Sequence, residues 1–253
     1  MAEKKKKSKI LVPITPGLVR DEGWVPDGWP FEDAAFDSSS DWKHLYRFHG
    51  SKGYTNGKTP VGSIRIARQG VGDSLRFLVA QRFEHDAGRN HEVKATVHCD
   101  ADPLATPKTW KLESRFTDQA GKPVAGTGSV VAGVFKNGKI TISTNGYKQT
   151  YSSDSLASDW TLIDAVQRLP FEEGKPHRFD MLEELTLFRP QHAIYYRGAE
   201  LFETGNRCLT LHRFDQVGTG TLPYNYWLDE NHRLILFVTL SQAYWLDSPE
   251  KKA

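Results

Sequence analysis

The sequence predicts a mostly β fold, built as one large curved antiparallel sheet with one short helix. The sheet is expected to form a half-barrel or a partly closed barrel. Three observations lead to this prediction. Apolar and polar residues alternate with a period of two along residues 91–100 and 109–117. Hairpin signals such as Asn137-Gly138 separate short apolar runs, and only residues 158–169 carry a convincing helical pattern.

Residues 1–41 predict an extended N-terminal arm with little regular structure. Prolines that resist helix and sheet interrupt it at Pro13, Pro16, Pro26 and Pro30. The arm is too aromatic for a solvated tail, so we expect it to be fixed against the surface of the sheet. The aromatic residues concerned are Trp24, Trp29, Phe31 and Phe36.

Residues 42–247 predict a single β domain, whose first lobe spans residues 42–155. Its segments are joined by short connections, which favour antiparallel neighbours. The expected strands are residues 44–49, 61–69, 74–85, 91–100, 109–117, 129–135, 139–144 and 149–152.

Residues 158–169 predict the helix that joins the two lobes. Ser158 is a suitable N-cap, Trp160 and Ile163 contribute to an apolar side, and Pro170 ends the helix. The segment 170–176 then predicts a hinge.

The second lobe, residues 176–247, predicts another series of antiparallel strands. These are residues 178–182, 191–203, 207–216, 221–228, 233–239 and 243–246. Residues 234–238 are apolar on both faces, which indicates a central and buried strand.

Composition excludes two classes of protein. The net charge of the 253 residues is +2, and the lysine run 4–7 lies in the arm, so the expected domain is close to neutral. A nucleic-acid-binding surface needs a clustered basic face, which this balance does not provide. No stretch approaches the ~20 apolar residues of a transmembrane helix, so no transmembrane segment is expected.

The chain as it stands is expected to be cytoplasmic. Residues 10–19 are apolar, but two prolines interrupt them and Arg20-Asp21-Glu22 follows in place of a cleavage site. A periplasmic or secreted location is the alternative if a leader has been removed.

The sequence predicts neither a metal nor a cofactor. Cys99 and Cys208 cannot form a framework of disulfides, and no metal-ligand spacing involves them. His91 and His98 are seven residues apart on one strand, so they face opposite sides of the sheet. No nucleotide-binding or nucleophile-elbow fingerprint occurs, and the acid pair Glu183-Glu184 is expected to be solvated.

Aromatic and basic residues on neighbouring strands give the best candidate binding surface. In the second lobe they are Tyr195, Tyr196, His212, Tyr224 and Tyr226. In the first lobe Arg65, His85 and His98 lie on polar faces of strands. If the sheet curves, such side chains can line a groove in which aromatic rings stack on a sugar or lipid and Arg meets an acidic group.

Residues 162–249 resemble a family of uncharacterised bacterial envelope proteins, a domain of unknown function. The features that carry the resemblance are the helix with Asp164 and Arg168, Gly174 in the link, the strand 195–200, Thr204-Gly205 before a strand, and Tyr226-Trp227-Leu228-Asp229 before Leu234. That family is similar to lipoprotein-carrier half-barrels, in which a curved sheet wraps an apolar groove. The resemblance implies a binding role and supplies no catalytic residues.

Three functions therefore stay open. The first is a binding protein that holds an apolar or amphipathic ligand in a groove of the sheet. The second is a carbohydrate-active enzyme, a lyase or hydrolase, that uses Tyr, His and Arg in such a groove. The third is a structural or assembly module. The expected partner is a small hydrophobic or carbohydrate ligand, and the oligomeric state is left open.

Overall fold

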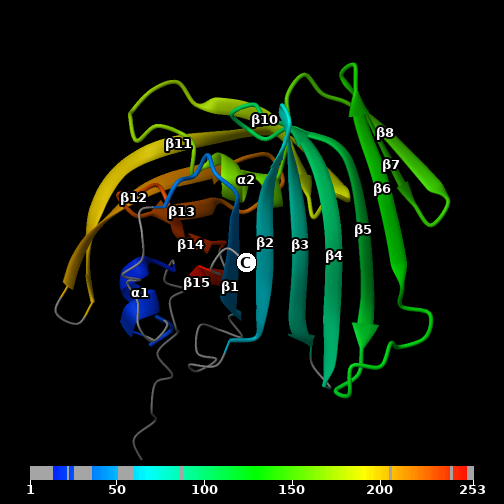
Figure 1. The fold of residues 1–253 in the computed structure, drawn as a ribbon, viewed down its shortest axis with the longest axis horizontal. Coiled ribbons are helices and arrows are strands. Elements are labelled where there is room, and N and C mark those ends of the chain that lie inside the picture. Colours follow the sequence, from blue (N-terminus) through cyan, green and yellow to red (C-terminus); the bar gives the residue numbers. More distant parts are fainter. Residues whose placement is uncertain are drawn as a thin grey trace, which may run out of the picture.

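The computed structural model describes residues 14–21, 23–25, 36–50, 60–85, 88–204, 207–239 and 242–249. All fifteen strands of this part join in one sheet, which confirms the predicted mostly β class (Figure 1). The strand order along the sheet is β8-β7-β6-β5-β4-β3-β2-β1-β15-β14-β13-β12-β11-β10-β9. Within the described residues the sheet does not close, and β8 and β9 form its two edges.

The first half of the sheet is an antiparallel meander. Its strands are β1 (Trp42–Gly50), β2 (Gly62–Val71), β3 (Ser74–His85), β4 (Arg89–Asp100), β5 (Pro107–Thr117), β6 (Ser129–Lys136), β7 (Lys139–Thr144) and β8 (Tyr147–Ser152). Burial alternates along β4 as the sequence predicts, with Val93 and Val97 buried and Lys94 and His98 exposed.

The second half continues the same pattern, except at its edge. Its strands are β9 (Leu156–Ser158), β10 (His177–Glu183), β11 (Leu187–Thr204), β12 (Arg207–Val217), β13 (Tyr224–Leu228), β14 (Leu234–Val238) and β15 (Gln242–Pro249). All five residues of β14 are buried, as expected for a strand that is apolar on both faces. The short β9 pairs in parallel with β10.

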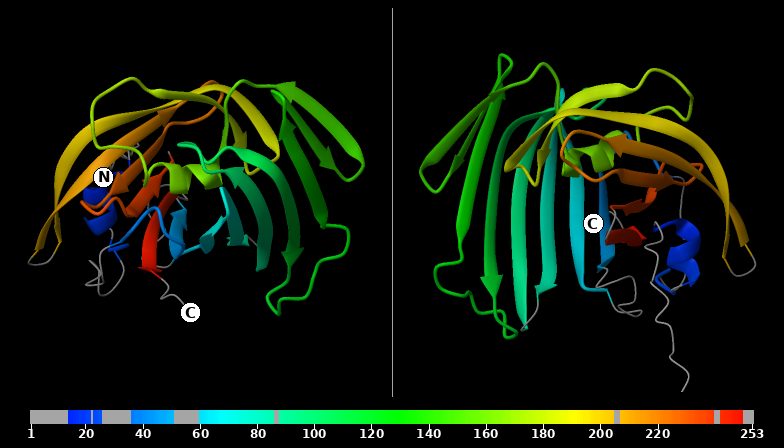
Figure 2. Two further views of the ribbon diagram at one scale, coloured as in Figure 1. Left: turned by 45° about the horizontal axis from the view of Figure 1, so that its top comes forward. Right: turned by 180° about the vertical axis from the view of Figure 1, so that it is seen from behind.

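The two halves meet where β1 pairs with β15, so residues 42–155 and 176–247 are parts of one continuous sheet. The sheet bends strongly, and its concave side surrounds the helix α2 (Asp159–Ala165) (Figure 2). The predicted helix is thus present but shorter, because residues 166–169 continue as turns before Pro170.

Helix α2 fills the concave side of the sheet. Ser158 caps it, with its Oγ accepting a hydrogen bond from the N–H of Thr161 at 3.1 Å. Leu162, Ile163 and Ala165 are almost fully buried. Burying these apolar side chains against the sheet stabilises a helix that is too short to persist alone.

Polar contacts fix α2 to both halves of the sheet. The buried Asp164 lies between Arg68 of β2 and Arg168, with N–O distances of 2.9 and 2.7 Å. Toward the other half, the N–H of Leu234 donates to Oε1 of the buried Gln167 at 2.9 Å. The C-terminal end of α2 is therefore tied to strands of both halves of the sheet.

A second short helix, α1 (Pro16–Asp21), lies in the arm, where little regular structure was predicted. It packs against β11, and the Arg20 guanidinium donates to the carbonyl of Glu203 at 2.9 Å. Trp24 is buried and stacks on His49 with the ring centroids 4.9 Å apart. Trp29 and Phe31 lie outside the described residues. Neither described helix is long and apolar enough to cross a membrane.

Candidate functional site

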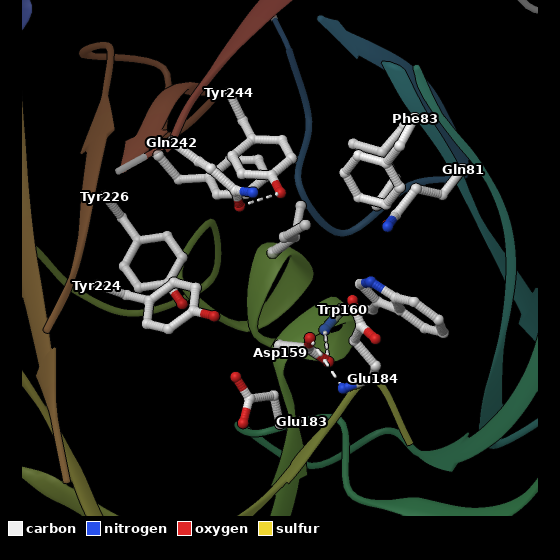
Figure 3. Close-up of a pocket in the computed structure, with 13 residues that line it drawn as sticks. Gln81, Phe83, Asp159, Trp160, Glu183, Glu184, Tyr224, Tyr226, Gln242 and Tyr244 are labelled. Atoms are coloured by element: carbon white, nitrogen blue, oxygen red, sulfur yellow. Dashed lines mark hydrogen bonds between the residues drawn. The ribbon is translucent and has the colours of Figure 1, made fainter. Parts of the chain in front are cut away.

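A cavity of about 150 Å³ lies on the concave side, between the N-terminal end of α2 and the surrounding sheet (Figure 3). Strands from both halves of the sheet contribute to it, together with the turn between β10 and β11. The residues that line it are Ile64, Gln81, Phe83, Asp159, Trp160, Ile163, Glu183, Glu184, Tyr224, Tyr226, Phe237, Gln242 and Tyr244. Three of them are acidic and six are aromatic, and none of the described lining residues is Lys, Arg or His.

The acidic side of the cavity joins the start of α2 to the β10–β11 turn. Asp159 is the first residue of α2, and its Oδ1 accepts from the N–H of Trp160 at 3.0 Å. Its Oδ2 accepts from the N–H of Glu184 at 3.0 Å. Both oxygens of the carboxylate are thereby oriented by backbone donors, and Glu183 and Glu184 are placed beside it.

The backbone of the β10–β11 turn has an unusual conformation. The N–H of Thr186 donates to the carbonyl of Glu183 at 3.1 Å, and the two central residues, Glu184 and Leu185, have φ of 48° and 56°. Two positive φ values are the signature of a type I′ turn, which favours Asn and Gly. The buried Leu185 keeps this geometry because its carbonyl accepts from Trp110 Nε1 at 3.0 Å. Strain of this kind concentrates at functional sites.

Burial and mutual repulsion govern the charge of these carboxyl groups. Burial, followed by the charge of Glu184, raises the pKa of Asp159 to about 8. Glu184 is exposed by its surface area, yet partial desolvation of its carboxyl group, followed by the charge of Glu183, raises its pKa as well. Glu183 is paired with Arg189 at 3.0 Å. Asp159 and Glu184 therefore retain their protons more readily than free carboxyl groups do.

An aromatic wall stands across the cavity from α2. Phe237 and Tyr244 stack with their centroids 4.3 Å apart, and Tyr226 lies 6.3 Å from Phe237. Burial raises the pKa of Tyr224, Tyr226 and Tyr244, so these phenols stay neutral in the physiological range. The wall presents ring faces and uncharged hydroxyls.

A buried polar network orients Tyr226. Its hydroxyl donates to Gln216 Oε1 at 2.7 Å, and Gln216 Nε2 donates to His192 Nδ1 at 3.1 Å. All three side chains are almost fully buried. Tyr244 is held in a similar way by Gln242, whose Oε1 accepts from its hydroxyl at 2.9 Å.

Two buried polar side chains on the other side of the cavity lack a partner. Gln81 exposes 5% of its surface and Trp160 exposes 4%. Neither the Gln81 amide nor the Trp160 indole N–H makes a hydrogen bond within the described residues. Figure 3 shows both on the side of the cavity opposite Tyr224 and Tyr226. Both side chains line the cavity, so their polar groups are available to a ligand.

The structure divides the residues that the sequence singled out. Tyr224 and Tyr226 line the cavity. Tyr196 and His212 form a separate cluster, joined by a hydrogen bond of 2.8 Å and covered by Phe171, which stacks on His212 at 3.8 Å. Tyr195 pairs with Asp215 on the other face and carries the Arg197 guanidinium 5.0 Å above its ring.

The first-lobe candidates do not join this cavity. Arg65 and His98 are exposed and belong to the polar face of their strands, away from the buried face that lines the concave side. The side chain of His85 lies outside the described residues. The polar face of the first lobe therefore does not line the cavity.

The acidic residues were missed from the sequence. Glu183-Glu184 was expected to be solvated, and Glu184 is exposed while Glu183 is half-buried; that both also line a cavity was not predicted. Adjacent acids between two strands carry no periodic signal, and Asp159 was not selected as a candidate. No group of three or more His, Cys, Asp or Glu residues in the described part of the chain could hold a metal ion.

No family model and no curated protein matches the chain. Among solved structures, a β-barrel-like protein of domain of unknown function DUF1849 from Brucella abortus is similar, with a TM-score of 0.55 at 10% sequence identity. The match covers 82% of this chain and 95% of that chain. The fold is β-barrel-like. At this identity the likeness shows the fold alone, and it supports a resemblance to an uncharacterised β-barrel-like family. The similarity to lipoprotein carriers stays a prediction.

Proposed function

We propose that the chain is a binding protein, and that the cavity between α2 and the aromatic wall holds a small amphipathic ligand. The observation that carries this proposal is the composition of the cavity. The rings of Tyr224 and Tyr226 line one side, and across from them lie Phe83, Gln81 and Trp160, with carboxyl groups completing the lining. Ligand sites in proteins combine an apolar lining with a few convergent polar groups in this way.

The composition favours an amphipathic ligand over a purely apolar one. An alkyl chain or a sterol would leave the Gln81 amide and the Trp160 indole N–H without hydrogen-bonding partners in a dry site, which is costly. The cavity also rests on elements that are fixed before any ligand arrives, because α2 is tied to both halves of the sheet. Preorganisation of this kind lowers the entropic cost of binding.

Native mass spectrometry of gently purified protein tests the proposal. An additional mass that disappears on denaturation is expected for the wild type. Gln81→Phe places a larger side chain in the cavity and should abolish that mass. Arg65→Phe, on the neighbouring strand but on its exposed face, should retain it. Retention of the mass by the Gln81→Phe variant, with circular dichroism unchanged, would show that the ligand binds elsewhere.

Carbohydrate hydrolysis is the second candidate, and one observation favours it. Asp159 has its pKa raised to about 8, while the neighbouring Glu183 is paired with Arg189. Two carboxyl groups in different environments are the arrangement from which acid and base roles arise. Turnover of a panel of aryl glycosides, lost in Asp159→Asn, would establish this activity. Equal rates in wild type and variant would eliminate it.

A further inference from the structure

We propose that the ligand of this cavity is a small organic ammonium ion that carries a hydroxyl group, as an amino alcohol does. The inference rests on the proposed function, because it names the chemical class of ligand for the same cavity.

The charges around the cavity select against anions. Asp159, Glu183 and Glu184 lie together, and Arg189 pairs with Glu183 alone. The described lining residues include no base that could meet a ligand carboxylate or phosphate. A cation is the ligand that relieves the repulsion between these carboxyl groups, since it favours their charged forms.

The aromatic wall is suited to the same cation. Tyr226, Phe237 and Tyr244 form a continuous series of rings in the lining of the cavity. Ring faces attract ammonium groups, and clustered aromatic side chains are a recurrent site for quaternary ammonium ions. Because the tyrosine phenols are neutral, their rings can attract the cation without adding a negative charge that would vary with pH.

The side chains of Gln81 and Trp160 would recognise the hydroxyl group of the ligand. Gln81 and Trp160 are each more than nine-tenths buried, yet neither has a hydrogen-bonding partner in the described part of the molecule. The indole N–H can only donate, whereas the amide can donate and accept. A hydroxyl on the ligand would satisfy both, because it also donates and accepts.

The cavity sets the size of the ligand. Its volume is about 150 Å³. Engineered cavities of about this volume hold benzene, so the space suits a ligand of roughly six to eight non-hydrogen atoms. Choline falls within this range and carries both a permanent ammonium charge and a hydroxyl.

Calorimetric titration of the full chain with choline, at pH 9, tests the inference. Its uncharged carbon isostere, 3,3-dimethylbutan-1-ol, has the same shape and hydroxyl but no charge. We expect choline to bind at least tenfold more tightly than the isostere. The anion 3,3-dimethylbutanoate should not bind.

The outcomes separate the inference from the proposed function. If the isostere or the anion binds as tightly as choline and Gln81→Phe abolishes that binding, the cavity is a ligand site but the ammonium inference fails. If none of the three compounds binds, the ammonium inference also fails. The native mass spectrum then decides the proposed function by itself.

Variants that neutralise one acidic residue of the cavity allow the binding of choline and of its isostere to be compared. Asp159→Asn and Glu184→Gln should each weaken choline binding by tenfold or more, and should leave binding of the isostere within twofold. Glu172→Gln removes an exposed carboxylate outside the cavity and should change neither. A uniform loss for both ligands in the acid variants would indicate structural damage and contradict a charge-specific role.

Proton release gives a readout that a merely structural role would not produce. Choline has no ionisable ammonium proton, so any proton released near pH 7 must come from the protein. The titratable groups that line the cavity are Asp159 of α2, Glu183 of β10, Glu184 of the turn, Tyr224 and Tyr226 of β13, and Tyr244 of β15, and Arg189 of β11 pairs with Glu183. Titrations in buffers of different ionisation enthalpy should show proton release with choline and none with the isostere. Absence of release with choline would overturn the inference.

Discussion

The carboxylate of Asp159 accepts a hydrogen bond from the backbone N–H of Glu184 at 3.0 Å, which ties the first residue of α2 to the β10–β11 turn. The two residues are 25 positions apart, and the charge of Glu184, after burial, raises the pKa of Asp159. The contact brings two acidic groups to one side of a cavity whose other side is aromatic. Acidic groups placed opposite aromatic rings distinguish this cavity from a gap left by imperfect packing of the sheet.

The first prediction concerns stability and pH. In the folded chain the pKa of Asp159 is about 8, above its ordinary value of 3.8. The folded state therefore binds more protons than the unfolded state between these values, and the free energy of unfolding should fall as pH rises from about 4 to 8. Glu184 acts in the same direction. Urea unfolding between pH 5 and 9 should show a shallower fall in Asp159→Asn than in wild type or Glu172→Gln. Equal slopes would contradict the raised pKa.

The second prediction concerns the backbone of the turn. Glu184 has φ of 48°, which costs a residue with a Cβ roughly 1 kcal/mol relative to glycine. Glu184→Gly should therefore be about 1 kcal/mol more stable than Glu184→Ala, although both lose the same carboxylate. Chemical denaturation of the two variants measures the difference. A more stable alanine variant would show that the turn is not strained.

The third prediction concerns the ion pairs that hold α2. Asp164 is fully buried between Arg68 and Arg168. Asp164→Ala would leave two guanidinium groups without their partner and should destabilise the fold by about 3–5 kcal/mol. Asp21→Ala breaks an exposed pair with Arg20 and should cost less than about 1 kcal/mol. Thermal unfolding of both variants tests this contrast. Similar losses would mean that the buried pair has no special role.

Much of the fold follows from local patterns in the sequence. Residues 234–238 are apolar on both faces, and the structure places them in a fully buried central strand. Ser158 and Pro170 delimit the helix, although its regular part ends at Ala165. Tyr224 and Tyr226 were selected as aromatic residues on strands expected to be neighbours, and both line the cavity.

The rest of the site depends on how the sheet bends. The sequence shows that Arg65 and His98 lie on polar faces, but α2 occupies the concave side and requires the apolar faces there. The polar faces consequently turn outward. Asp159 and Glu184 meet only because the β10–β11 turn reaches the start of α2, a long-range contact that no local periodicity encodes.

The last prediction links the sheet to the site through one glycine. A Cβ at Gly133 of β6 would lie 2.1 Å from the ring of Trp110, whose indole N–H donates to the carbonyl of Leu185 in the β10–β11 turn. Gly133→Ala should therefore displace Trp110, cost about 1–3 kcal/mol of stability and weaken ligand binding through the turn. Gly128→Ala meets open space and should be close to neutral. Denaturation and the native mass spectrum of both variants check this, and an unperturbed Gly133→Ala would show that Trp110 has room to shift without moving Glu184.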